Sequence, residues 1–229
     1  MIPEPKSFLN ETPELEIDAS LSKAAYHRTP EVHGWKLDTE LSNQNRSVYS
    51  KGIRAKVAYR GTNLKSNETW LDDLGTDFMI LAGLQDKATR FKNAQRTAEL
   101  AMEKYGSKNV SLTGYSLGGA QSAYVSRKTG LKATGFNPGW GLRDPLKNRT
   151  YSNFTNITTQ GDVVSYLGQS SKKMKQVHIP TTALSTHSIE NFIGYEYPQQ
   201  DIVMSSAYSY TPREWIHESS SSIPQPIHS

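Results

Sequence analysis

The sequence predicts a single α/β domain of the α/β/α type, in which a mostly parallel central sheet lies between two layers of helices. Segments with strand-like apolar patterns alternate along the chain with segments whose apolar residues recur at helical spacing. A chain of 229 residues also suits one large domain with a self-supporting core. We expect residues 1–13, which contain three prolines, to be an extended arm, 14–196 to be the α/β domain, and 197–229, rich in Ser, Tyr and Pro, to be a tail.

In the first quarter of the chain, one predicted helix precedes a group of strands. Residues 14–28 carry apolar side chains at helical spacing and are predicted to be that helix. Residues 34–42 and 45–52 flank a polar turn, which is the pattern of a β-hairpin. Residues 53–61 alternate in polarity and stop at a glycine, which predicts a strand that ends in a tight loop.

The rest of the domain alternates helices with strands. Three helices are predicted by apolar spacing, over 69–83, 85–106 and 117–130. Four strands are predicted, over 109–114, 131–137, 154–162 and 174–180, and a last helix over 188–195. This alternation is typical of parallel strand pairs with helices covering both faces of the sheet.

The composition excludes several kinds of chemistry and location. The chain has no cysteine, which rules out disulfides and thiolate metal ligands and leaves oxygen or nitrogen as a nucleophile. A mean hydropathy of −0.63 and the lack of a long apolar run predict no transmembrane segment. The N-terminus has no basic segment followed by an apolar one, so we predict no signal peptide. We therefore expect a cytoplasmic protein or one packaged with an assembly.

The chain is moderately basic, with a formal net charge of +4 and a pI near 9.1. Such a charge mildly favours anionic surfaces such as phospholipid. The tight basic cluster formed by Lys172, Lys173 and Lys175 fits an ordinary solvated loop. No basic stripe alternates with aromatic residues, so nucleic acid is not an expected partner.

The segment VSLTGYSLGGAQ, residues 110–121, places Ser116 between Gly114 and Gly118, after an apolar run and before a helical pattern. A serine on a sharp strand-to-helix turn is presented as a nucleophile, and the flanking positions are glycines because side chains there would collide with the crossing elements. The amides and the positive dipole end of the following helix would then face a developing oxyanion. The short pattern alone also occurs by chance, so partners elsewhere in the chain must support it.

A serine nucleophile needs a histidine base and a carboxylate that orients the imidazole. Hydrolases with this type of turn carry the acid and then the histidine downstream of the serine. His187 follows a Thr/Ser-rich loop and is the favoured base, whereas His178 lies within a predicted strand. Asp162 follows a strand and a glycine and is the favoured acid, although its position also suits a loop cap. Asp144 precedes a proline and fits a turn or a cap.

Five segments carry a resemblance to a known family: KVAYRGT, TWLDDL, LTGYSLGGAQ, TTQGDVVSYL and HSIENFIG. In this order they resemble the motif set of class 3 lipases, the fungal-lipase-like branch of the α/β-hydrolases. The resemblance covers residues 20–195 and implies an α/β-hydrolase fold. It also implies Ser116 as the nucleophile, Asp162 as the acid and His187 as the general base.

The same resemblance implies roles for residues around these three. The amides of Thr62 and Leu117 would form the oxyanion hole, and the carboxylate of Asp73, or of the adjacent Asp72, would hold the Thr62 hydroxyl. The segment 63–83 corresponds to the lid of the family. Its apolar face would consist of Trp70, Leu71, Leu74, Phe78, Met79 and Ile80. These residues equally fit a buried core.

Tyr115 departs from the family, which usually has histidine at this position. We expect this change to alter the packing of the turn without touching the chemistry.

The sequence therefore predicts a serine hydrolase of carboxylic esters, an acylglycerol lipase or a phospholipase of the A type, that works through an acyl-enzyme. Its expected partners are a lipid ester and a transient lipid or membrane surface, and it is expected to need no metal or organic cofactor. Two alternatives stay open. One is a non-catalytic protein that uses the hydrolase fold for assembly, and the other is an acyltransferase with the same three residues.

Overall fold

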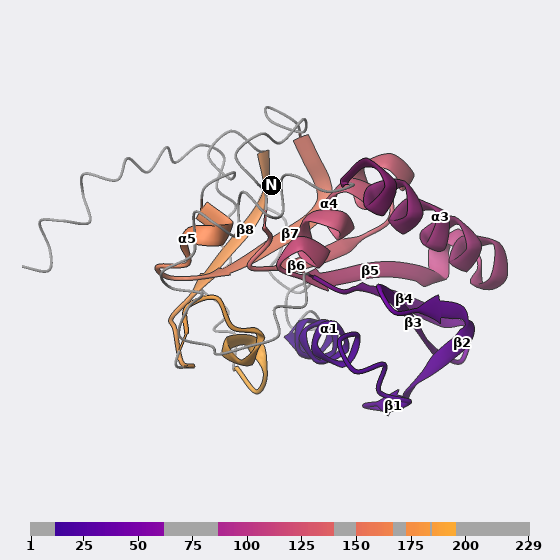
Figure 1. The fold of residues 1–229 in the computed structure, drawn as a ribbon, viewed down its shortest axis with the longest axis horizontal. Coiled ribbons are helices and arrows are strands. Elements are labelled where there is room, and N and C mark those ends of the chain that lie inside the picture. The colour runs from indigo at the N-terminus through magenta and orange to yellow at the C-terminus, as the bar shows by residue number, and fades with distance from the viewer. Residues whose placement is uncertain (1–11, 62–86, 140–149, 167–172, 184, 196–229) are drawn as a thin grey trace, which may run out of the picture.

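The computed structural model describes residues 12–61, 87–139, 150–166, 173–183 and 185–195. These residues form one mixed sheet of eight strands with helices packed on it (Figure 1). The strands are β1 (Glu31–Val32), β2 (Trp35–Asn43), β3 (Arg46–Lys51), β4 (Arg54–Tyr59), β5 (Val110–Tyr115), β6 (Ala133–Phe136), β7 (Thr150–Thr159) and β8 (Lys173–Ile179). The helices are α1 (Thr12–Ala24), α3 (Lys87–Tyr105), α4 (Leu117–Thr129) and α5 (Val163–Tyr166), with the 3₁₀ turns η3 (Ser107–Asn109) and η4 (Ile189–Phe192).

The strands lie side by side in their order along the chain, from β1 to β8. Neighbours from β1 to β4 are antiparallel, and neighbours from β4 to β8 are parallel. The predicted parallel sheet is therefore confirmed for the C-terminal half, whereas the N-terminal half is an antiparallel meander. Short turns suffice in that half because antiparallel neighbours need no crossover connection.

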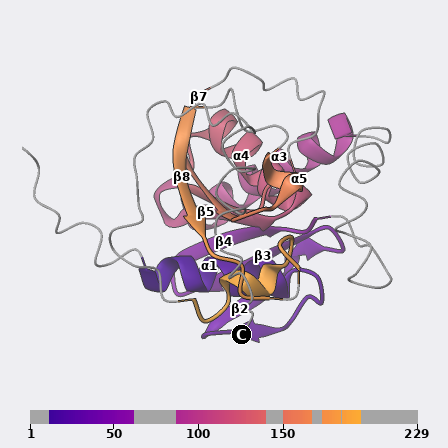
Figure 2. The ribbon, with the colours of Figure 1, turned by 90° about the vertical axis from the view of Figure 1, so that its left-hand side faces the viewer.

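Helices lie on both faces of the sheet, and the two layers have different origins. Crossovers between parallel strands are right-handed, and the strand order never reverses, so successive crossover helices are directed to the same face. α3 and α4 share that face, while α1 lies on the opposite one (Figures 1 and 2). η4 packs beside α1, so the chain that follows β8 returns to the α1 face.

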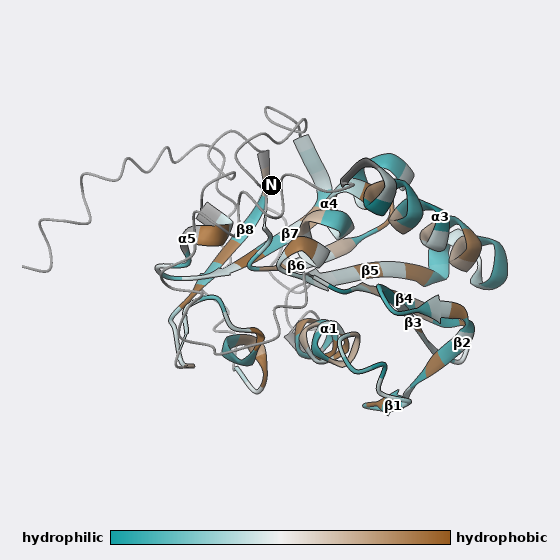
Figure 3. Cartoon of the chain, viewed as in Figure 1, coloured by the Kyte–Doolittle hydropathy of each residue, from teal (hydrophilic) through white to brown (hydrophobic). Residues whose placement is uncertain are grey.

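The main core lies between the sheet and the helices α3 and α4. Ala94, Ala98 and Ala101 of α3 are fully buried, and Phe91 and Met102 are partly buried against the same cluster. These five residues are the inner face that the spacing of the helix predicts. Figure 3 shows both hydrophobic and hydrophilic residues on α3 and α4, as expected of helices with one face on a sheet and the other in water.

A buried ion pair joins α1 to the sheet. Lys56 Nζ of β4 lies 2.8 Å from Asp18 Oδ1 and 2.8 Å from Glu14 Oε2. Thr134 of β6 donates a hydrogen bond to the other Asp18 carboxylate oxygen at 2.8 Å. Buried charges need such partners, and these contacts set the position of α1 over the middle of the sheet.

Several elements differ from the predictions at their ends. α1 begins at Thr12, so the last two residues of the predicted arm are helical. It ends at Ala24 instead of 28, and Arg28 has a φ of 52°, which a right-handed helix cannot contain. β7 begins at Thr150, four residues earlier than predicted. Lys173 and Lys175 belong to β8, so this part of the basic cluster lies in a strand and not in a solvated loop.

The predicted last helix, 188–195, is only the single turn η4. The Ser188 side chain accepts a hydrogen bond from the Glu190 amide at 3.3 Å, which caps the start of the turn. Gly194 has a φ of 68°, which ends right-handed helical geometry two residues after η4. The predicted helix over 69–83 and the tail over 197–229 lie outside the described residues. Within the described segments, no helix combines the length and the apolar character needed to cross a membrane.

Candidate active site

Ser116 stands at the turn between β5 and α4. Its φ of 57° and ψ of −127° are values that residues with a Cβ atom rarely adopt. Three backbone hydrogen bonds hold the turn: the Ser116 amide donates to the Phe136 carbonyl at 3.0 Å, and the Ser116 carbonyl accepts from Ala120 at 3.2 Å and from Gly139 at 2.9 Å. Such strained residues persist only where the surrounding structure holds them, and they cluster at functional sites.

The two glycines that flank Ser116 allow β5, α4 and β4 to approach each other closely. A Cβ atom on Gly114 would overlap the carbonyl group of Gly118, and one on Gly118 would overlap the carbonyl group of Tyr59. Any side chain at these positions would therefore push α4 away from the strands. This is the packing role that the sequence predicts for Gly114 and Gly118.

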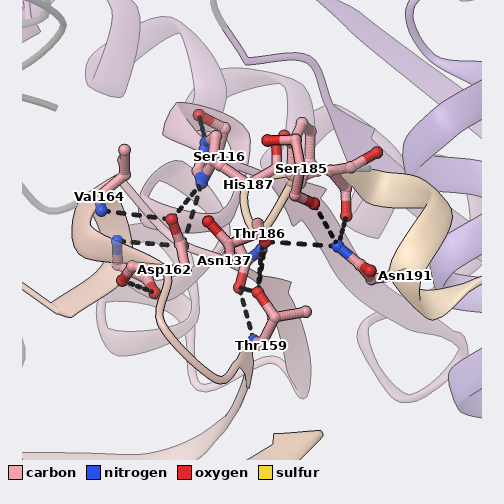
Figure 4. A network of polar contacts seen from close by, with 12 residues as sticks. Ser116, Asn137, Thr159, Asp162, Val164, Ser185, Thr186, His187 and Asn191 are labelled. Atoms are coloured by element: carbon pink, nitrogen blue, oxygen red, sulfur yellow. Dashed lines mark hydrogen bonds and ion pairs between the residues drawn. The ribbon is translucent and has the colours of Figure 1, made fainter. Parts of the chain in front are cut away.

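Three predicted residues come together as one hydrogen-bonded chain (Figure 4). His187 Nε2 lies 3.0 Å from Ser116 Oγ, and His187 Nδ1 lies 2.9 Å and 3.0 Å from the two Asp162 carboxylate oxygens. Because an ionised carboxylate only accepts, Nδ1 carries the proton and Nε2 is left to accept the hydrogen bond of the Ser116 hydroxyl. Each of the three residues is only 4% exposed, so little water competes for these bonds.

Asp162 is oriented by the start of α5. It follows β7 after the turn at Gly161, whose φ is 81°. One carboxylate oxygen accepts from the Val164 amide at 3.3 Å, and the other accepts from the Ser165 amide at 3.2 Å. Asp162 therefore fills both of the roles that its position suggests, because it caps a helical turn and binds His187 with the same carboxylate.

The loop that carries His187 is held by the buried amide of Asn191. Its Oδ1 accepts from the amides of Thr182 at 2.8 Å and Ala183 at 2.6 Å. Its Nδ2 donates to the carbonyls of Ser185 at 2.9 Å and Ser188 at 3.2 Å. One side chain in η4 thus ties both ends of the loop together, and it is fully buried.

A second buried amide, Asn137, joins the same loop to the sheet. Its Oδ1 accepts from the Thr159 amide at 2.9 Å, and its Nδ2 donates to the Thr186 carbonyl at 3.0 Å. The Thr159 hydroxyl also donates to the Thr186 carbonyl. Asn137 has a φ of 41°, a conformation that asparagine tolerates better than most residues. The residue before His187 is therefore fixed to the ends of β6 and β7.

Tyr115 contacts the histidine loop directly. Its hydroxyl donates to the His187 carbonyl at 2.5 Å, and the two rings lie 5.2 Å apart. Burial raises the pKa of Tyr115 well above its usual value, and the nearby Tyr26 and Asp162 raise it further, so the phenol stays protonated as a donor. Tyr115 thus affects more than the packing of the turn, because it supplies a bond to His187.

These positioning residues were missed by sequence reasoning. Asn137 directly follows a predicted strand, and Asn191 lies in a segment predicted to be helical. An asparagine at either place is an ordinary loop or cap residue when only local spacing is considered. One local signal did point to Asn137: it lies at the end of a predicted strand and directly before Pro138, which marks a turn at the edge where the parallel strands end.

His178, the less favoured base, lies away from this site. Its Nδ1 is 2.7 Å from the hydroxyl of Thr158 on the neighbouring strand. Burial lowers the pKa of His178, and both residues face the same side of the sheet. The expectation that this ring belongs to a sheet face is confirmed.

The oxyanion-hole positions are described only in part. Leu117 is the first residue of α4, and the first amides of a helix have no acceptor within the helix. The Leu117 amide therefore makes no hydrogen bond within the helix, and Leu117 directly follows Ser116 in the chain. The other predicted site and lid residues lie outside the described residues, namely Thr62, Asp72, Asp73, Trp70, Leu71, Leu74, Phe78, Met79, Ile80 and the alternative acid Asp144.

The chain matches no protein-family model, and comparison with curated proteins gives no match either. What this site does must therefore be inferred from its residues and their geometry.

Proposed function

We propose that the protein is a serine hydrolase of carboxylic esters with an α/β-hydrolase fold, similar to class 3 lipases, and that it acts on lipid esters. The observation that carries this proposal is the buried chain of hydrogen bonds from Ser116 through His187 to Asp162. The backbone strain at Ser116 supports it, because packing alone gives no reason to hold a serine in this conformation.

In the proposed reaction, Ser116 Oγ attacks the carbonyl carbon of the ester, and His187 Nε2 takes the hydroxyl proton. The tetrahedral intermediate then collapses, and the same proton passes from His187 to the departing alcohol. Asp162 keeps Nδ1 protonated and stabilises the imidazolium while it exists. Water, activated by His187, then attacks the acyl-enzyme and releases the carboxylic acid and free Ser116.

The Leu117 amide is the donor that this proposal assigns to the oxyanion. It lies at the positive end of α4, where a developing negative charge is favoured. Thr62 is proposed as the second donor by the resemblance of its segment to the lipase motif. Removal of one such donor costs about 2.7–4 kcal/mol in the activation free energy of comparable enzymes.

A lipid ester is the proposed substrate class because the five resembling segments belong to lipases and because a basic chain favours anionic lipid surfaces. The proposed encounter with lipid is transient. The apolar residues of the segment 63–83 would supply the contact, as in the lid that the resemblance implies.

The decisive experiment is labelling with a fluorophosphonate, followed by assays on p-nitrophenyl esters of increasing chain length and on phospholipid vesicles. We expect stoichiometric labelling at Ser116 and a loss of at least about a thousandfold in kcat for Ser116→Ala. Ser152→Ala, an exposed serine of β7, is the matched control and should keep full activity.

Other outcomes would point to the two alternatives. A folded protein that neither labels nor hydrolyses any ester would be a non-catalytic protein with this fold. Product shifting from acid to a new ester when an alcohol acceptor is added would indicate an acyltransferase with the same triad.

A further inference from the structure

Tyr26 lies in the turn that follows α1 and contacts the end of β4. Its amide donates to the Lys23 carbonyl at 3.1 Å, which ties it to the last residues of α1. Its hydroxyl oxygen accepts a hydrogen bond from the Gly61 amide at 3.1 Å. The guanidinium carbon of Arg60 lies 5.4 Å from the centre of the Tyr26 ring, which is the distance of a cation–π contact. Tyr26 therefore contacts both residues that follow β4 in the described chain.

Gly61 is packed closely against Tyr26 and against the turn that carries Ser116. A Cβ atom built on Gly61 would come 2.5 Å from the Tyr26 hydroxyl oxygen and 2.9 Å from the Tyr115 carbonyl oxygen. The same Cβ atom would come 3.2 Å from Ser116 Cβ. The backbone at Gly61 thus shares one small space with the Tyr26 hydroxyl and with the proposed nucleophile.

The sheet provides no acceptor for the Gly61 amide. The pairing of β4 with β5 ends at Tyr59, and the Arg60 amide still donates to the Asn45 carbonyl at 3.1 Å. Gly61 lies one residue further and is buried, and in the part of the chain that the structure describes Tyr26 is the only acceptor of its amide. Because a buried amide without a partner is costly, the bond to Tyr26 helps to determine where the chain runs after β4.

The position of Gly61 bears on the proposed oxyanion hole. Thr62, the proposed second donor, directly follows Gly61 in the chain, and Leu117, the first donor, directly follows Ser116. A backbone amide stabilises an oxyanion only when it lies within hydrogen-bond distance of the place where the charge develops. A displacement of Gly61 relative to Ser116 would therefore weaken the stabilisation of the transition state.

The ring of Tyr26 makes a separate contact toward the histidine loop. The centres of the Tyr26 and Tyr115 rings lie 6.2 Å apart, and the Tyr115 hydroxyl donates to the His187 carbonyl. The Tyr26 ring therefore packs against a residue that holds His187, whereas the Tyr26 hydroxyl bonds to the end of β4. Tyr26→Phe keeps the ring and removes the hydroxyl, so this variant separates the two contacts.

We propose that Tyr26 is a positioning residue of this site, whose hydroxyl holds the Gly61 backbone at the distance from Ser116 that the oxyanion hole requires. This inference rests on the proposed hydrolase function and gives Tyr26 a part in stabilising the transition state without contact with the reacting atoms. Burial raises the pKa of Tyr26 above its usual value, although the Gly61 hydrogen bond and the charge of Arg60 act in the opposite direction. The phenol is therefore uncharged near neutral pH and adds no titration of its own there.

The bond itself is tested first, without turnover, from the hydrogen exchange of the Gly61 amide measured by NMR in the full chain. We expect Tyr26→Phe to speed this exchange at least about tenfold. Tyr49→Phe is the matched control, because the Tyr49 hydroxyl donates to the carbonyl of Thr29 in the same turn after α1 at 3.1 Å. It removes one tyrosine hydroxyl from that turn and should leave the exchange of Gly61 unchanged. Equal exchange in the wild type and Tyr26→Phe would overturn the proposal whether or not the protein is a hydrolase.

Kinetics are then measured on a short p-nitrophenyl ester, with the concentration of active sites taken from fluorophosphonate labelling so that misfolded protein is not counted. We expect Tyr26→Phe to lower kcat about tenfold and to keep KM within about twofold of the wild type, because an oxyanion hole acts on the transition state and not on the bound substrate. Tyr49→Phe should keep both constants. An unchanged kcat in Tyr26→Phe, or an equal loss in Tyr49→Phe, would overturn the positioning role.

The pH profile of kcat/KM distinguishes the two contacts of Tyr26. Activity falls at low pH as His187 takes up a proton in the free enzyme, and this limb of the profile should keep its wild-type position in Tyr26→Phe. A shifted limb would mean that Tyr26 acts on His187 through Tyr115 and would overturn the assignment to Gly61. A wild type that neither labels nor hydrolyses any ester would defeat the proposed function, while the hydrogen exchange would still decide whether Tyr26 holds Gly61.

Discussion

Replacing Ser116 by glycine is predicted to leave the protein more stable than replacing it by alanine. Both substitutions remove the hydroxyl and its hydrogen bond to His187, so the difference between them reports on the backbone alone. The φ of 57° and ψ of −127° are open to glycine but strained for any residue with a Cβ atom. Such strain costs about 1–3 kcal/mol, and glycine loses roughly 0.5–1 kcal/mol relative to alanine through its greater freedom in the unfolded chain. We therefore expect the glycine variant to be more stable by about 1 kcal/mol.

The measurement is urea unfolding of both variants, followed by the fluorescence of tryptophan, since Trp35 is buried in the folded protein. Equal slopes of the free energy against urea would show that the two unfolded states are comparable. For a chain of this length, the expected difference also corresponds to about 2–4 °C in Tm.

A control at an ordinary helical position gives the opposite order. Lys92 is exposed in α3, and Lys92→Ala should be more stable than Lys92→Gly by about 1 kcal/mol. If Ser116→Ala proved as stable as Ser116→Gly, the turn would not be strained and its support for a nucleophile would be lost.

Two further predictions concern stability. Asn191→Leu should lower the free energy of unfolding by about 3–5 kcal/mol in a guanidinium titration, because it leaves several buried backbone groups of the loop before η4 without partners. Asn93 is exposed on α3, and Asn93→Leu should change the free energy of unfolding by less than about 0.5 kcal/mol. An equally small effect of Asn191→Leu would contradict the proposal that Asn191 anchors the loop. Burial of Asp38 acts to raise its pKa, but hydrogen bonds from Tyr105 and Lys104 outweigh this effect and hold the pKa below its usual value. Ionised Asp38 therefore contributes to the free energy of unfolding above about pH 4, and this contribution is lost as the pH falls through the lowered pKa. Urea unfolding of the wild type and Asp38→Asn should therefore show a stability difference near pH 6 that closes in acid, and a difference that stays constant with pH would refute this assignment.

The candidate site shows which features local patterns can predict. Ser116 was chosen from its flanking glycines, and Asp162 and His187 were chosen from their positions after predicted strands and loops. Their side chains do lie within hydrogen-bond distance, although 71 residues separate Ser116 from His187 and 25 separate His187 from Asp162. The three side chains lie close together because parallel strands end at one edge of a sheet, which brings residues just after those ends near each other.

The groups that orient His187 could not be predicted in the same way. Tyr115, Asn137 and Asn191 each bond to backbone atoms of its loop, and those bonds depend on how the loop folds back over the strand ends. Nothing in the local spacing of an asparagine or a tyrosine specifies a carbonyl many residues away. Burial then makes each contact obligatory, since an unpaired amide or phenol in the interior is costly.

The sequence by itself determined the order of strands and helices, the strand-to-helix turn at Ser116 and the order of the serine, acid and histidine along the chain. Periodicity and glycine positions carry this information because they depend on a few neighbouring residues. Only the tertiary structure decided that the strands keep their chain order, that α1 and η4 cover one face while α3 and α4 cover the other, and that Tyr115, Asn137 and Asn191 hold the loop that carries His187. Those features arise from contacts between distant segments, which exist only once the sheet has formed and its faces have been covered.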